Sequence, residues 1–113
     1  GIWSSVTDLH KYYLALQKPA FLNKEIIAGS MQVKRFDNWS SEKEPNNGYS
    51  WFITKAINGL ERIGHTGSQG GFRANFQFIP EKKIFVGMLF NTPHNCDILM
   101  EKIELILKEE NYL

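Results

Sequence analysis

Four strand-like segments follow one another between residues 49 and 90, and only short turns separate them. The pair Asn58-Gly59 is the strongest short signal for a β-hairpin. A glycine-rich segment at 67–71 and the polar run at 80–83 mark the next two turns. Such short connections join antiparallel neighbours, because a parallel pair needs a crossover of a dozen or more residues. The sequence therefore predicts an antiparallel meander with strands at about 49–57, 60–66, 72–79 and 84–90.

The third of these segments has two unlike faces, because alternate residues of a strand point in opposite directions. One face is apolar and the other is polar: Phe72, Ala74, Phe76 and Phe78 against Arg73, Asn75 and Gln77. The fourth segment is almost continuously apolar, which indicates that both of its faces are covered.

Helical patterns flank the strands. Ser5 can cap a helix with Asp8 in its first turn, and Pro19 ends the apolar periodicity that follows. Asn23 can cap a second, short helix that reaches about Met31, and residues 34–48 are typical of a long polar loop. A last helix is expected at about 97–110, with its buried stripe formed by Leu99, Ile103, Ile106 and Leu107.

These elements predict a single α+β domain over residues 1–113, in which helices flank an antiparallel sheet of about four strands. The composition, 42% hydrophobic with a net charge of +1, suits a globular core and gives no sign of nucleic-acid binding. No apolar run approaches the roughly 18 residues of a membrane-spanning helix. His10, His65 and His94 lack metal-ligand spacing, and Gly67 to Gly71 matches no phosphate loop, so we expect no metal and no cofactor.

The segment from Gly64 to Phe72 is the best candidate for a functional site. It places His65 and Thr66 at the expected end of a strand, immediately before a glycine-rich turn where a ligand can come close to the backbone. Such a pair most often marks only a strand end and a turn. The functional alternative is an anion-binding ledge, in which a side chain holds a carboxylate and strand N–H groups face a reacting carbonyl.

Three stretches together resemble the C-terminal part of the serine β-lactamase-like hydrolases, a family that includes class C β-lactamases, D-alanyl-D-alanine carboxypeptidases and esterases. The first is Gly1-Ile2-Trp3-Ser4-Ser5-Val6-Thr7-Asp8-Leu9, which resembles the family pattern that opens a helix. The second is Gly64-His65-Thr66-Gly67, which resembles the family motif Lys-Thr-Gly or His-Thr-Gly. The third runs from Gly71-Phe72-Arg73 through Pro80 to Leu89-Phe90-Asn91.

The resemblance implies roles for four residues. His65 stands where the motif has its basic residue, and Thr66 and Gly67 would lie against the substrate. The backbone N–H of Ser68 would be one of two oxyanion-hole donors. His in place of Lys favours a peptidase or esterase over a dedicated β-lactamase. The family likeness also implies a bacterial, exported or periplasmic protein.

The nucleophile is expected elsewhere. We expect the family's nucleophile motif Ser-x-x-Lys to be absent from the chain, and its second motif Tyr-x-Asn finds no convincing match. Both are therefore expected upstream of Gly1, in an N-terminal segment of the same protein. The chain would then be the substrate-binding and oxyanion-hole half of an enzyme for a small acyl or peptide substrate. Alone it should be inactive and prone to self-association. The alternative is a non-catalytic peptide- or protein-binding module on the same scaffold.

Overall fold

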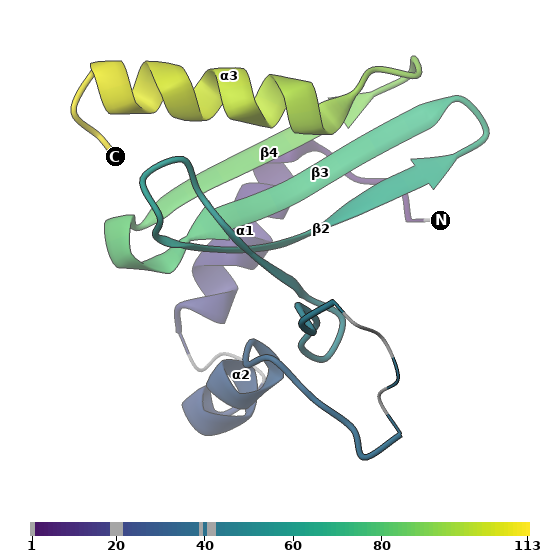
Figure 1. Ribbon diagram of the computed structural model, residues 1–113. Coiled ribbons are helices and arrows are strands. Elements are labelled where there is room, and N and C mark those ends of the chain that lie inside the picture. The colour runs from purple at the N-terminus through teal and green to yellow at the C-terminus, as the bar shows by residue number, and fades with distance from the viewer. Residues whose placement is uncertain (1, 19–21, 39, 41–42) are drawn as a thin grey trace.

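The computed structural model describes residues 2–18, 22–38, 40 and 43–113, and these form a four-stranded sheet with helices on both faces (Figure 1). All pairings are antiparallel, in the order β1-β2-β3-β4. The predicted α+β meander is therefore confirmed. The elements in chain order are α1 (Val6–Leu16), α2 (Lys24–Ser30), β1 (Phe52–Lys55), β2 (Glu61–Gln69), β3 (Phe72–Ile79), β4 (Ile84–Phe90) and α3 (Cys96–Glu109).

The helices begin where the capping residues predict. The Ser5 hydroxyl accepts a hydrogen bond from the Asp8 N–H at 3.1 Å, and the Asn23 side chain accepts one from the Ile26 N–H at 2.8 Å. Each cap satisfies a backbone donor that the first turn of a helix leaves unpaired. Pro19, expected to end the first helix, lies outside the described residues.

The second strand differs from its prediction. It was expected to end at Thr66, before a long glycine turn, but β2 continues to Gln69, because residues 67–69 pair with residues 72–74 of β3. The turn shrinks to Gly70 and Gly71, whose φ angles of 49° and 90° suit a two-residue hairpin. The expectation that His65 and Thr66 close a strand is therefore wrong, and both lie inside β2.

The first strand is shorter than predicted. β1 spans only Phe52–Lys55, because the chain turns at Ser50, whose φ is 62°. This short strand covers only the first half of the longer β2, from Glu61 to Gly64.

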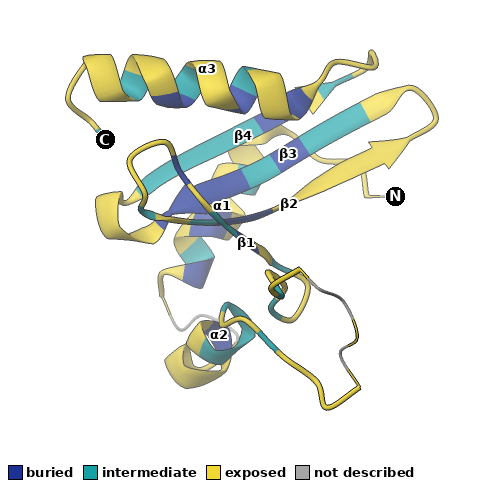
Figure 2. Cartoon of the chain, viewed as in Figure 1, coloured by how far each residue is buried: buried dark blue, intermediate teal, exposed yellow. Residues whose placement is uncertain are grey.

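Two clusters of apolar side chains hold the helices to the sheet. Behind the sheet, Tyr13 of α1 stacks on Phe85 with ring centroids 5.1 Å apart and lies against Phe78. On the opposite face, Met100 and Cys96 of α3 pack against Met88. Figure 2 shows that burial concentrates where these helices cross the strands, while the tip of the β2–β3 hairpin is exposed. The fold thus leaves this tip available for contacts.

The polar face of β3 lies beneath α3. Asn75 is 0% exposed and Gln77 is 9% exposed. The buried stripe of α3 also differs from its prediction, because Ile106 is exposed and the buried positions are Cys96, Met100 and Glu104. The covered face of the sheet is polar in part, so α3 turns a carboxylate toward it.

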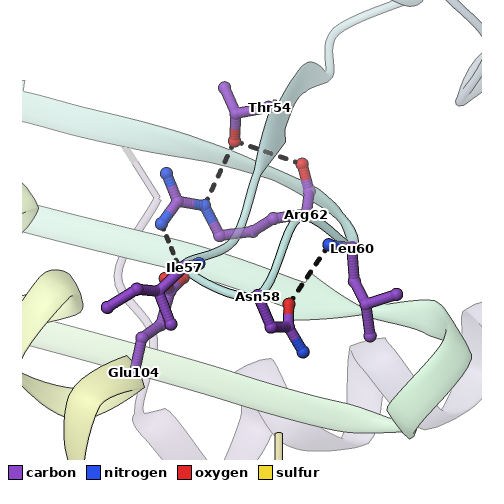
Figure 3. A network of polar contacts seen from close by, with 6 residues as sticks. All are labelled: Thr54, Ile57, Asn58, Leu60, Arg62 and Glu104. Carbon is purple, nitrogen blue, oxygen red and sulfur yellow. Dashed lines mark hydrogen bonds and ion pairs between the residues drawn. The ribbon is translucent and has the colours of Figure 1, made fainter. Parts of the chain in front are cut away.

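That carboxylate ties α3 to the β1–β2 hairpin (Figure 3). Glu104 lies 2.6 Å from Nη1 of Arg62 and accepts a hydrogen bond from the Ile57 N–H at 2.8 Å. The Nε of Arg62 donates to the Thr54 hydroxyl at 3.1 Å. Since each group has a partner, the buried charges can be accommodated under the helix.

Candidate functional site

The outer edge of β2 is open along its second half. β1 pairs with β2 only from Glu61 to Gly64. Residues 65–69 pair with β3 on one side, and every one of them is exposed. In the described part of the chain no other strand pairs with this edge. It can therefore receive an extended ligand.

The hydrogen-bond pattern fixes which backbone groups face the open edge. The Ile53 N–H donates to the Asn46 carbonyl, away from β2, so its neighbours Phe52 and Thr54 direct their backbone groups toward β2. The backbone N–H and C=O groups of their partners, Gly64 and Arg62, therefore point toward β1. Because strand N–H groups alternate between the two edges, the N–H groups of Thr66 and Ser68 point outward, past the end of β1.

His65 lies beside this edge. Its ring stacks on Phe52 with centroids 4.7 Å apart, and its Nδ1 lies 2.6 Å from the Thr66 carbonyl oxygen. A carbonyl oxygen only accepts hydrogen bonds, so Nδ1 carries the proton in this contact. Nε2 can then accept a hydrogen bond from a ligand. The imidazole is thus held beside the open edge by the Phe52 ring and the Thr66 carbonyl.

The other three predicted residues line two different hollows near this edge. Gly67 and Ser68 line an open groove of about 850 Å³ at the hairpin tip. Thr66 lines a smaller pocket of about 230 Å³ on the α3 side, together with Arg62 and Gln77. His65 lines neither hollow. The four residues are consecutive on one strand, but the structure does not gather them into one pocket.

No clear pattern in the sequence pointed to the residues that shape the small pocket. Gln77 lies flat across β2 because position 64 is glycine: a Cβ there would collide with the Phe76 carbonyl oxygen and lie 2.6 Å from Cγ of Gln77. The alternation of β3 predicted that Gln77 lies on the polar face of the strand. Such a face is usually solvated, so the sequence did not indicate a pocket there. The charge of Glu104 within an apolar helix stripe was the one available hint that the opposing face is polar.

The expectation that the chain lacks the spacing Ser-x-x-Lys is wrong. Ser40 and Lys43 have the spacing Ser-x-x-Lys, although a match was expected only upstream of Gly1. Both residues lie in irregular chain rather than in a helix, and the two residues between them are outside the described ranges. On a helix the Ser-x-x-Lys spacing brings the two side chains together, because residues three apart are neighbours there. Irregular chain does not impose this arrangement.

Two further properties bear on what the site can hold. Among the described residues, no three His, Cys, Asp or Glu side chains are grouped as a metal site would require. Within the same ranges, none of the helices has the length and apolar character needed to cross a membrane.

Comparison with known proteins identifies the family of the chain. A family model described as Beta-lactamase matches residues 1–109. The chain belongs to the beta-lactamase family. No curated protein matches it.

Among solved structures, the chain is similar to the octameric penicillin-binding protein homologue from Pyrococcus abyssi, with 30% sequence identity and a TM-score of 0.77. The match covers 93% of this chain and 24% of that one, so this chain spans about a quarter of that relative's length. The resemblance inferred from the sequence is thereby confirmed at the level of family and fold.

Proposed function

We propose that this chain forms the substrate side of a serine hydrolase active site, in a protein that cleaves an amide or ester through an acyl-serine intermediate. The observation that carries the proposal is the open edge of β2, where the Ser68 N–H points outward in a member of the beta-lactamase family. A fixed N–H in that position can stabilise the negative charge that develops on a carbonyl oxygen during acyl transfer.

The neighbouring residues would hold the substrate along the same edge. The Thr66 N–H also faces outward, and the His65 ring can reach a ligand through Nε2. Gly67 offers no side chain to obstruct a ligand that approaches the backbone. These contacts suit a peptide-like or ester substrate in extended conformation.

In this proposal the serine and its base belong to a longer protein, in a segment that precedes the present residues. The known relative is about four times longer than the matched region, which supports a catalytic unit that this chain fills only in part. Self-association is a second proposed property, supported by the exposed apolar side chains Ile26, Val33 and Phe36 and by the octameric state of that relative. Sedimentation velocity of the 113-residue chain at micromolar concentration should show species larger than a monomer, and a stable monomer would refute it.

The open edge also suits a non-catalytic module, because an extended peptide can add to a free strand edge. Covalent labelling separates the two functions. A fluorophosphonate should form a phosphonyl-serine adduct, with loss of fluoride, on the longer protein but none on the 113-residue chain, as judged by intact mass. Absence of an adduct on both would favour the module. An adduct on the short chain that Ser40→Ala abolishes would place the nucleophile in this chain.

Ser68 provides the test of the oxyanion role. In the longer protein, Ser68→Ala should be nearly silent, because only the N–H is needed. Ser68→Pro removes that N–H and should lower turnover by about 10²–10³-fold. Since this N–H faces the open edge, proline breaks no ladder hydrogen bond there, and circular dichroism can verify the fold. A folded Ser68→Pro enzyme with normal turnover would remove Ser68 from the oxyanion hole.

A further inference from the structure

The open part of the β2 edge lacks the features that usually keep a strand edge from pairing. Protein edges are protected by charged side chains, by proline or by bulges. Residues 65–69 read His-Thr-Gly-Ser-Gln, without lysine, carboxylate or proline, and they pair with β3 in an unbroken register. All of them are exposed. This segment can therefore pair with a further strand.

The outward backbone groups of this segment are complementary to themselves. The N–H and C=O groups of Thr66 and Ser68 face outward, and those of the alternate residues face β3. If a second copy pairs antiparallel about a two-fold axis at Gly67, Thr66 of each copy lies opposite Ser68 of the other. Both members of such a pair present a donor and an acceptor, so they exchange both N–H···O bonds.

The two ends of the open segment favour this register over its neighbours. At one end β1 begins at Phe52, opposite Gly64. At the other end the chain turns back into β3 at Gly70 and Gly71. A shift by one residue would set outward backbone groups against inward ones. A shift by two would carry part of the pairing past the open segment.

The side chains that meet in this register are also compatible. Gly67 lies opposite itself at a position without hydrogen bonds, where antiparallel strands come closest, and it has no side chain to obstruct them. His65 lies opposite Gln69 of the second copy on the same face, so its Nε2 can accept from the Gln69 amide. The Thr66 carbonyl already lies 2.6 Å from His65 Nδ1, and its second lone pair can accept from the second copy's Ser68 N–H.

We propose that two copies of this chain associate through the open edge of β2, antiparallel and with the two-fold axis at Gly67, so that their sheets join into one. This interface is separate from the exposed apolar side chains near α2, such as Ile26. The pairing occupies the edge that an extended substrate would use, so dimer and substrate exclude each other. That consequence rests on the proposed function, whereas the pairing itself does not.

Amide hydrogen exchange of the 113-residue chain at increasing concentration is the first test. The outward N–H groups of Thr66 and Ser68 should exchange rapidly in dilute solution. At millimolar concentration they should exchange about 10-fold or more slowly, because the second copy supplies acceptors. The N–H groups of His65 and Gly67 face β3 in either state, so their exchange should change far less. They serve as controls within the same strand.

Disulfide linking then tests the register. Gly67→Cys places two cysteines opposite each other, with Cα atoms about 4.5 Å apart, a separation that a disulfide can span. Gln69→Cys is the matched control on the same strand face, because its two copies lie roughly 14 Å apart in this register. Mild oxidation should link the first variant about 10-fold or more faster than the second. The buried Cys96 is common to both variants.

The fold should tolerate Gly67→Cys, since a Cβ at this position would lie 3.5 Å from Ala74 Cβ, an ordinary contact. Exchange of the unsubstituted chain tests the pairing without any variant.

Two results would overturn the proposal. Exchange of Thr66 and Ser68 that does not depend on concentration would place any association on another surface, even if sedimentation shows larger species. Linking of Gln69→Cys as fast as Gly67→Cys would exclude the register. Failure of the proposed function would look different, as the absence of a fluorophosphonate adduct on the longer protein, and would leave the edge pairing standing.

Discussion

The buried carboxylate of Glu104 offers a direct test of what holds α3 on the sheet. Its side chain is 3% exposed and accepts from Arg62 Nη1 at 2.6 Å and from the Ile57 N–H at 2.8 Å. Glu104→Ala removes both acceptors and leaves a guanidinium with a side chain only 18% exposed and no counter-charge. Breaking a buried pair in this way costs about 3–5 kcal/mol. Small domains have a total stability of roughly 5–15 kcal/mol, so the variant should be close to unfolding.

Urea denaturation followed by tryptophan fluorescence measures the change in the free energy of unfolding. Glu101→Ala is the matched control, because it makes the same substitution on the exposed side of the same helix and should change stability by no more than about 0.5 kcal/mol. Glu104→Gln should fall between the two, since it keeps an acceptor for the Ile57 N–H but loses the charge.

The double variant Arg62→Met, Glu104→Met distinguishes pairing from packing. It removes both charges together, so it should cost less than Glu104→Ala alone. The remaining loss should be about 1–3 kcal/mol, from the unsatisfied Ile57 N–H. If Glu104→Ala is no more destabilising than Glu101→Ala, the reasoning about the buried pair is refuted.

Three other outcomes are expected. Gly64→Ala should destabilise the chain by about 1–3 kcal/mol through its collision with β3, whereas Gly67→Ala, whose Cβ would lie 3.5 Å from Ala74 Cβ, should be tolerated in the same urea assay. In the longer protein His65→Ala should lower turnover and change the melting temperature only slightly, because the exposed imidazole loses a single ring contact, with Phe52. Unchanged kinetics would exclude His65 from the site. Burial raises the pKa of the Cys96 thiol. The contribution of the thiol to stability is therefore complete below its ordinary pKa and is lost as the pH rises through the raised pKa. Between pH 7 and pH 10, the free energy of unfolding should decrease more for the wild type than for Cys96→Ala.

Local signals in the sequence determined most of the elements of this fold. Ser5 and Asn23 predicted two helix starts, because a cap acts on N–H groups three residues away. Asn58-Gly59 and the turn before β4 predicted the meander, since short connections leave few ways to pair strands. The motif around His65 and Thr66 likewise predicted the family, which the match over residues 1–109 confirms.

Tertiary structure alone decided the features that depend on distant partners. The end of β2 was misplaced because strand pairing with β3, rather than glycine propensity, determines where the hairpin turns. Ile106 was expected to be buried, but Glu104 occupies the covered stripe because Arg62, 42 residues away, supplies its counter-charge. The open edge beside Ser68 likewise exists only because β1 begins at Phe52, opposite Gly64. No local pattern within β2 predicts where the neighbouring strand begins.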